Sequence, residues 1–209
     1  MKKFLLVDDH VVVRSGVKAL LTSLFSPSEI YEASDGNSAI KLLNQYHYDL
    51  VILDIQMPNT DTIGLVDHIH IKFPEAKILM FSMSAEKMYA ARFLKAGAKG
   101  FISKDAPLDE ITKAIETILN GRKYISDTLA DELAERSFSN NSGNPFEKLS
   151  RREFEIVTLL LSGKTLSEIS SSLNLQTSTV GTHKARLFEK LNVTNILELK
   201  ELAVSYDLK

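Results

Sequence analysis

Phe4-Leu-Leu-Val7 is a run of four apolar residues that ends directly at two carboxylates, Asp8 and Asp9. A short run without polar alternation is typical of a strand that is buried on both faces of a parallel sheet. Four similar runs follow along the chain, and longer segments of helical period lie between them. The runs are Glu29–Ala33, Leu50–Leu53, Lys77–Phe81 and Gly100–Ser103, and the helical segments include Val13–Leu24, Asn37–Tyr46 and Leu108–Leu119. The sequence therefore predicts an α/β domain in which five parallel strands alternate with five helices.

Polar side chains stand at the carboxyl ends of four of these strands, the edge at which parallel sheets bind ligands. Asp8 and Asp9 follow the first strand, and Asp54, Ser82 and Lys104 follow the third, fourth and fifth strands. Three close carboxylates repel one another without a cation, and a set of oxygen donors favours Mg²⁺. An ammonium group and a hydroxyl beside such a site are typical of phosphoryl transfer to a carboxylate nucleophile.

Each of these residues also has an ordinary structural interpretation. Asp8 and Asp9 could cap the helix that follows them, and Ser82 could be a strand-end hydroxyl that bonds to the local backbone. Lys104 could be a solvated surface charge, and the segment Asp54–Pro58 could be only a turn that ends a strand. The joint placement at four strand ends is what favours a functional site.

The composition is that of an ordinary globular protein: 209 residues, 44% hydrophobic and 25% charged, with a formal net charge of −2. Because the chain has no cysteine, disulfides and thiolate metal sites are excluded. The five histidines are scattered and give little indication of a transition-metal centre. No apolar run approaches the roughly 20 residues that span a bilayer, so we expect a cytoplasmic protein.

The chain is expected to hold two domains joined by a linker. Residues 1–147 carry 16 basic and 20 acidic residues, a net charge of −4, whereas residues 148–209 carry 9 and 7, a net charge of +2. The stretch Ser137–Phe146 is rich in polar turn formers, which predicts a flexible linker. We therefore expect a first domain over residues 1–122, a helix and linker over 123–147, and a second domain over 148–209. The modest basicity of the second domain is a weak sign of nucleic-acid binding.

The second domain is expected to be a compact all-α bundle of four helices. Ser150 with Glu153, and Thr165 with Glu168, have the spacing of capping boxes at two helix starts. A third helix is predicted over Thr177–Leu191, with basic side chains on the faces away from its apolar positions. Two short helices, a tight turn and a basic helix are typical of a helix-turn-helix, whose second helix lies in the major groove of DNA.

Four motifs in the first 120 residues resemble the signatures of bacterial receiver domains: Leu6–His10, Leu53–Pro58, Phe81-Ser82 and Gly100–Lys104. The resemblance implies a flavodoxin-like (βα)5 fold and phosphorylation of Asp54 by a sensor histidine kinase. It further implies that Asp8, Asp9, Asp54 and the backbone carbonyl of Gln56 bind Mg²⁺, and that Ser82 and Lys104 bind the phosphoryl oxygens. Phe101 corresponds to the aromatic that moves inward on activation, and its other interpretation is a static aromatic of the core. No enzyme activity is implied beyond the domain's own phosphoryl transfer and dephosphorylation.

One departure from the receiver pattern follows the phosphoacceptor motif. The family usually has a glycine four residues after the proline, whereas here Gly64 stands six residues after Pro58. We therefore expect the loop after Asp54 to be two residues longer than usual, with the acidic cluster itself unchanged.

The C-terminal region resembles the LuxR-type DNA-binding domain over nearly all of residues 148–205. The matching stretches are Leu149–Glu155, Ser167–Ile169, Thr179-Val180 and Lys190–Val193. Together the two resemblances imply a response regulator of the NarL/FixJ family that binds double-stranded promoter DNA and forms a homodimer when phosphorylated. The candidate DNA-binding residues are Thr179, Thr182, His183, Lys184, Arg186 and Lys190, any of which could instead be a solvated helix residue. Family members often have lysine where this chain has Gly181, so sequence readout is expected to differ.

Three other classes of protein fit the sequence less well. A phosphatase or phosphotransferase for small molecules would also use aspartate and Mg²⁺, but it normally needs a substrate pocket or a cap insertion. A nucleotide enzyme would need a glycine-rich loop after the first strand, where this chain has Asp8, Asp9 and His10. A protein-interaction adaptor without a DNA role is disfavoured by the C-terminal helices but is compatible with Gly181.

Overall fold

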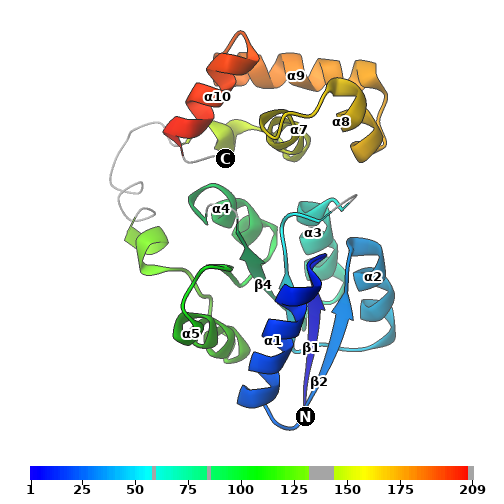
Figure 1. Cartoon of the computed structure of the whole chain (residues 1–209), viewed down its shortest axis with the longest axis vertical. Coiled ribbons are helices and arrows are strands. Elements are labelled where there is room, and N and C mark those ends of the chain that lie inside the picture. The colour runs from blue at the N-terminus through cyan, green and yellow to red at the C-terminus, as the bar shows by residue number, and fades with distance from the viewer. Residues whose placement is uncertain (58–59, 84–85, 132–143, 207–209) are drawn as a thin grey trace. The chain divides into compact units, whose positions relative to one another are not determined.

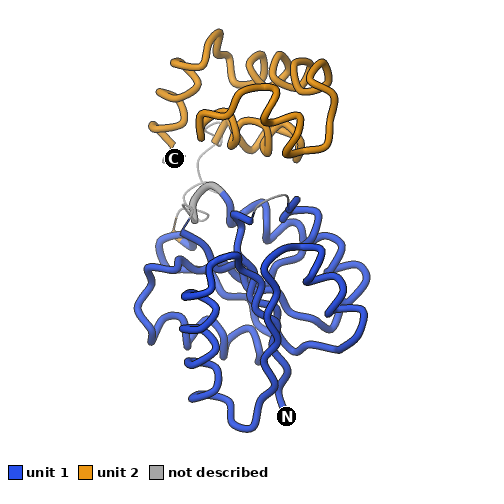
Figure 2. Tube along the Cα trace, turned by 45° about the vertical axis from the view of Figure 1, so that its right-hand side comes forward, with its two compact units in different colours: residues 1–130 blue, residues 131–209 orange. Residues whose placement is uncertain are grey.

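A computed structural model of the chain describes residues 1–57, 60–83, 86–131 and 144–206. The chain divides into two compact units, residues 1–130 and 131–209 (Figure 2). Most of the expected linker, residues 132–143, lies outside the described residues, and so do Pro58 and Asn59 of the loop after Asp54.

The first unit is built on a parallel sheet of five strands in the order β2-β1-β3-β4-β5 (Figure 1). All four strand pairs are parallel, as the apolar runs predict. The three inner strands are almost entirely buried, which explains why their sequences show no polar alternation. The strands are β1 (Lys2–Val7), β2 (Ser28–Ala33), β3 (Leu50–Leu53), β4 (Lys77–Ser82) and β5 (Gly100–Ser103).

Five helices cover the two faces of this sheet, so the predicted flavodoxin-like alternation is confirmed. Alternate strand residues, among them Leu6, Ile52 and Phe81, form one core with apolar residues of α1 and α5. Helix α2 packs against β1 and β2, while α4 packs against α3 and β5. The helices are α1 (Val11–Leu24), α2 (Gly36–Gln45), α3 (Thr62–Lys72), α4 (Glu86–Ala96) and α5 (Leu108–Leu119).

Residues 123–130 continue to pack on the first unit. The backbone N–H of Tyr124 donates to the carbonyl of Lys99 at 2.9 Å, and the Tyr124 hydroxyl donates to Glu110 at 2.9 Å. Leu129 is buried as well. The domain limits at residues 122 and 148 stay predictions.

Residues 144–206, the described part of the second unit, contain the expected four helices after a short 3₁₀ turn. Both capping boxes are present: the Ser150 side chain accepts from the backbone of Glu153, and Thr165 accepts from Glu168, with the reciprocal bonds also formed. Asn174 ends the second helix in the left-handed conformation. The elements are η1 (Pro145–Lys148), α7 (Arg151–Leu161), α8 (Leu166–Leu173), α9 (Thr177–Leu191) and α10 (Ile196–Ser205). Among the described residues, no helix is both long enough and apolar enough to span a membrane.

Candidate functional site

Asp8, Asp54 and Lys104 meet at the carboxyl edge of the sheet. Asp8 is 4% exposed and Asp54 is 3% exposed, and they follow the neighbouring strands β1 and β3. The Nζ atom of Lys104 lies 2.6 Å from Asp8 Oδ2 and 2.8 Å from Asp54 Oδ2. The backbone N–H of Ile55 donates to the other Asp54 oxygen at 2.7 Å. Two buried carboxylates are therefore held side by side by one buried ammonium group.

The charge of Lys104 is stabilised by these carboxylates. Burial lowers the pKa of Lys104, but the hydrogen bonds to Asp54 and Asp8 outweigh that effect, so the net pKa lies above its ordinary value of 10.5. Lys104 therefore stays cationic at neutral pH, as charge neutralisation at a phosphoryl site requires.

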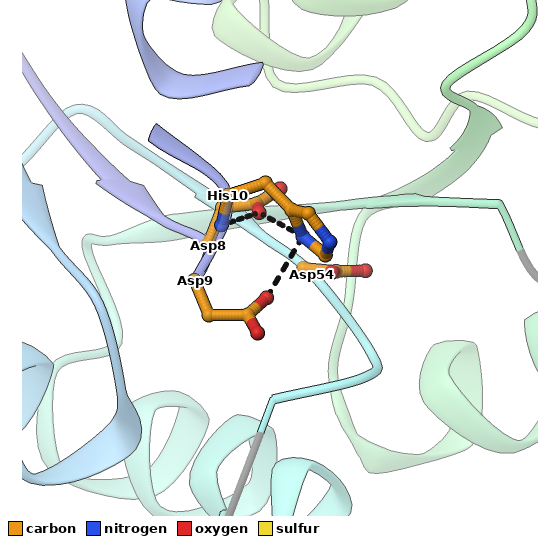
Figure 3. Close-up of side chains that lie close together, drawn as sticks. All are labelled: Asp8, Asp9, His10 and Asp54. Atoms are coloured by element: carbon orange, nitrogen blue, oxygen red, sulfur yellow. Dashed lines mark hydrogen bonds and ion pairs between the residues drawn. The ribbon is translucent and has the colours of Figure 1, made fainter. Parts of the chain in front are cut away.

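Asp9 and His10 complete the cluster (Figure 3). One donor atom from each of Asp8, Asp9, His10 and Asp54 lies within 4.8 Å of all the others. The Nδ1 atom of His10 is 2.9 Å from Asp9 Oδ1 and 3.2 Å from Asp8 Oδ1, and the His10 side chain is 63% exposed. The predicted acidic set is thus brought together, with a histidine that sequence reasoning did not include. Its position directly after Asp8 and Asp9 was the available signal.

Ser82 and Phe101 lie on the last two strands of the sheet, β4 and β5. Ser82 ends β4, is buried, and accepts a backbone hydrogen bond from Lys104 at 3.1 Å through its carbonyl. Phe101 lies in β5 and is completely buried. Its side chain is therefore inside the protein in this structure, which is the position that the receiver resemblance associates with activation.

The loop after Asp54 is attached at two described points. The Thr62 hydroxyl donates to the Ile55 carbonyl at 2.7 Å, and the Thr60 hydroxyl accepts from the Gly36 N–H at 3.1 Å. Gln56 is exposed, and the role expected of its backbone carbonyl stays a prediction. The expected lengthening of the loop falls partly on residues 58 and 59, outside the described part.

The candidate DNA-binding residues all lie on α9. Thr182, Arg186 and Lys190 are exposed, while Thr179, His183 and Lys184 are half-buried. The Thr182 hydroxyl donates to the carbonyl of Ser178 at 3.0 Å, and the Lys184 ammonium lies 5.1 Å from the centre of the Phe188 ring. A Cβ atom added at Gly181 would meet no described atom within 4 Å, so this helix position is open.

Lys190 has a partner inside the protein. Its Nζ atom donates to Glu153 Oε2 at 2.7 Å, and the Glu153 side chain is 4% exposed against 41% for Lys190. The same oxygen accepts from the backbone N–H and the hydroxyl of Ser150 at 2.7 and 2.8 Å. Burial raises the pKa of Glu153, but the bonds from Lys190 and Ser150 prevail, so the pKa lies below its ordinary value. Sequence reasoning found the capping box of Ser150 and Glu153. It missed that Glu153 also binds Lys190, near the C-terminal end of α9.

Comparisons with known proteins find a match for each of the two units. Residues 4–116 match the response regulator receiver domain, and residues 147–203 match the luxR family of bacterial regulatory proteins. The chain is 33% identical to the response regulator UvrY of Escherichia coli K12, over 100% of this chain and 96% of that protein. It is 32% identical to the response regulator GacA of Pseudomonas aeruginosa, over 100% and 98%.

A solved structure shows the same fold. RcsB from Salmonella enterica serovar Typhimurium, bound to the promoter rprA in the presence of the phosphomimetic BeF₃⁻, matches with a TM-score of 0.75. The match covers 98% of this chain and 100% of RcsB at 23% identity. With two family matches in the predicted order and full-length relatives above 30% identity, the chain belongs to the NarL/FixJ family of response regulators, in which a receiver domain is joined to a LuxR-type DNA-binding domain.

Proposed function

We propose that this response regulator is phosphorylated on Asp54 by a sensor histidine kinase and that phosphorylation controls its binding to promoter DNA. The observation that carries the proposal is the position of Asp54, buried beside Asp8 with the Lys104 ammonium 2.8 Å from its carboxylate. A regulator that binds the chromosome acts where the DNA lies, so we place the protein in the cytoplasm.

The phosphoryl transfer follows from the positions of three side chains. An oxygen of Asp54 attacks phosphorus, an O–P bond forms, and the P–N bond to the kinase imidazole breaks. Lys104 is already bound to Asp54 and moves one N–H to a phosphoryl oxygen, where its positive charge offsets the added negative charge. The Ser82 hydroxyl, at the end of the adjacent strand, is proposed to donate to another phosphoryl oxygen. Hydrolysis of the same bond restores Asp54, and we propose no other catalytic activity.

The acidic cluster fits a divalent cation. Asp8, Asp9 and Asp54 each offer a carboxylate oxygen within 4.8 Å of the others, and hard oxygen donors are those that Mg²⁺ prefers. We propose the backbone carbonyl of Gln56 as a further ligand. When bound, Mg²⁺ supplies charge neutralisation of the phosphoryl oxygens.

The signal is proposed to pass from Asp54 to the face formed by α4, β5 and α5. A phosphoryl group adds roughly two negative charges. We propose that Ser82, drawn toward this group, vacates space for Phe101 and favours its buried position over an exposed one, which alters the face that β5 shares with α4. We propose that this altered face promotes homodimerisation and frees α9 for DNA.

On the DNA side we propose that Lys184 and Arg186 contact phosphates, while Thr179, Thr182 and His183 lie toward base edges. Because the Lys190 ammonium is bound to Glu153 at 2.7 Å, we propose that Lys190, which the sequence marks as a candidate DNA contact, stabilises the domain instead of contacting a phosphate. Two domains on paired half-sites would supply the affinity that one weakly basic domain lacks.

The phosphorylation proposal is tested with acetyl phosphate and Mg²⁺. Asp54→Asn should abolish incorporation of phosphate, whereas Asp67→Asn, a change to an exposed aspartate on α3, should leave it intact. Labelling that persists in the Asp54→Asn protein would identify another acceptor and refute the proposal. Genome-wide mapping of bound DNA with the wild-type and Asp54→Asn proteins then tests whether phosphorylation controls promoter occupancy.

A further inference from the structure

We propose that His10 is a ligand of the divalent-cation site and that it gives the site a higher affinity for first-row transition ions, with Ni²⁺ as the probe, than for Mg²⁺. This inference rests on the proposed function, because it requires a cation beside Asp8, Asp9 and Asp54. Its consequence is regulatory: a transition ion held by His10 would compete with the Mg²⁺ that phosphorylation uses.

The position of the His10 ring carries the inference. In an octahedral site with bonds of about 2.1 Å, adjacent ligand atoms are separated by about 3.0 Å. The Nδ1 atom of His10 lies 2.9 Å from Asp9 Oδ1 and 3.2 Å from Asp8 Oδ1 (Figure 3). These are the separations of neighbouring ligands around one ion.

The outer limits of the cluster agree with a single ion. Opposite ligands of such a site are about 4.2 Å apart, again for bonds of about 2.1 Å. The four donor atoms of Asp8, Asp9, His10 and Asp54 all lie within 4.8 Å of one another. Closing around an ion therefore needs only a contraction of several tenths of an ångström.

The remaining contacts leave this geometry available. Lys104 approaches the Oδ2 atom of Asp8, whereas Oδ1 accepts the backbone N–H of His10 at 2.8 Å and faces the His10 ring. The ammonium group and the ring therefore contact different oxygens of the same carboxylate. The ring is 63% exposed, so its other nitrogen can carry the proton in contact with water while Nδ1 binds the ion.

The donor set determines which ions gain from His10. Imidazole suits Ni²⁺, Zn²⁺ and Cu²⁺, and affinity for a mixed nitrogen and oxygen site rises from Mn²⁺ to Cu²⁺. Mg²⁺ prefers oxygen and keeps several waters, so a water molecule replaces the imidazole at little cost. Removal of His10 should therefore weaken the binding of transition ions selectively.

Calorimetric titration of the tag-free full-length protein tests this inference with NiCl₂ and MgCl₂. His10→Ala should lower the Ni²⁺ affinity by at least about tenfold and leave the Mg²⁺ affinity within about threefold. The matched control is His47→Ala, because His47 is an exposed histidine outside the cluster, and this variant should bind both ions as the wild type does. A hyperfine-shifted imidazole N–H signal in the proton NMR spectrum of the Ni²⁺ form should vanish in His10→Ala.

Two outcomes separate this inference from the proposed function. Equal Ni²⁺ affinity in the wild type and His10→Ala, with Mg²⁺ binding intact, overturns the role of His10 and leaves the phosphorylation site standing. Asp9→Asn provides the second comparison. If this variant binds both ions as tightly as the wild type, the cation site itself is refuted, and the inference fails with it.

Discussion

Replacing Lys190 with methionine should destabilise the second unit rather than remove a DNA contact. Methionine keeps the apolar stem of the lysine and removes only the ammonium group that binds Glu153 at 2.7 Å. Removing one partner of a fully buried pair costs about 3 to 5 kcal/mol, whereas an exposed pair contributes about 0 to 1 kcal/mol. Because Lys190 is 41% exposed, and because Ser150 still donates two hydrogen bonds to Glu153, we expect a loss of about 1 to 2 kcal/mol.

Hydrogen exchange of the full-length protein measures this loss locally. A cost of this size raises the unfolded fraction by a factor of roughly 5 to 30, so amides of α7 and α9 should exchange faster by that factor. Arg186→Met is the matched control, since Arg186 is an exposed cation on the same helix with no carboxylate partner among the described residues. It should leave exchange unchanged.

DNA binding should show the opposite pattern: Arg186→Met changes it and Lys190→Met does not. Each phosphate contact contributes about 0.9 to the slope of log affinity against log salt concentration. Arg186→Met should therefore flatten the slope by about one unit, while Lys190→Met should leave it unchanged at a temperature where both proteins are folded. Unchanged exchange in Lys190→Met together with a flattened slope would refute the reasoning, because Lys190 would then serve DNA and not Glu153.

Three further predictions concern pH and backbone conformation. The pKa of Glu153 is lowered in the folded state. Its contribution to stability is therefore present above the ordinary value of 4.5 and is lost as the pH falls through the lower folded pKa. Glu153→Gln should flatten the acid limb of a curve of stability against pH followed by circular dichroism. Gly97→Ala should cost roughly 1 to 3 kcal/mol, because φ is +116° and the new Cβ would lie 2.3 Å from the His70 ring, whereas Gly16→Ala within α1 should stabilise by up to about 1 kcal/mol in urea unfolding. Burial raises the pKa of Tyr48 to about 12, so stability should decline between pH 10 and 12, and ultraviolet titration should show one late tyrosine that is missing in Tyr48→Phe.

Sequence reasoning reached the fold because the determining features are local or periodic. Buried parallel strands must be apolar on both faces, and this requirement is visible as uninterrupted runs such as Leu50–Leu53. Capping boxes join residues three apart, so the pairs Ser150 with Glu153 and Thr165 with Glu168 are readable before any tertiary contact is known.

The proximity of Asp8, Asp54 and Lys104 was predictable for a different reason. Asp8, Asp54 and Lys104 are separated by up to 96 positions, yet each directly follows a strand, and parallel strands all end at the same edge. The topology of the sheet therefore brings together residues that are far apart in the sequence. To predict that Asp54 and Lys104 lie close together, one needs only the strand order and not the conformation of any loop.

Side-chain partnerships outside this logic could not be predicted. Lys190 and Glu153 are 37 positions apart on two helices, and a basic residue on an exposed helix face fits a phosphate contact as well as an ion pair. The crossing of α9 and α7 brings the Lys190 ammonium to the buried Glu153 carboxylate. The helical period of the sequence does not predict this crossing. Which of the two roles Lys190 has depends on whether the buried Glu153 carboxylate could stay ionised with its other hydrogen-bond donors alone.

His10 shows the same limit within the acidic cluster. Its position after Asp8 and Asp9 fixes where the backbone goes, but only the rotation about its side-chain bonds decides whether Nδ1 points at the carboxylates or at solvent. The Nδ1 atom of the ring contacts both Asp8 and Asp9, and a proton on this nitrogen would offset the mutual repulsion of the two carboxylates as Lys104 does. A cation that enters this cluster must therefore either displace the His10 ring from Asp8 and Asp9 or bind the ring as a ligand. For an ion that favours imidazole, binding the ring keeps its nitrogen coordinated and gives the more stable complex.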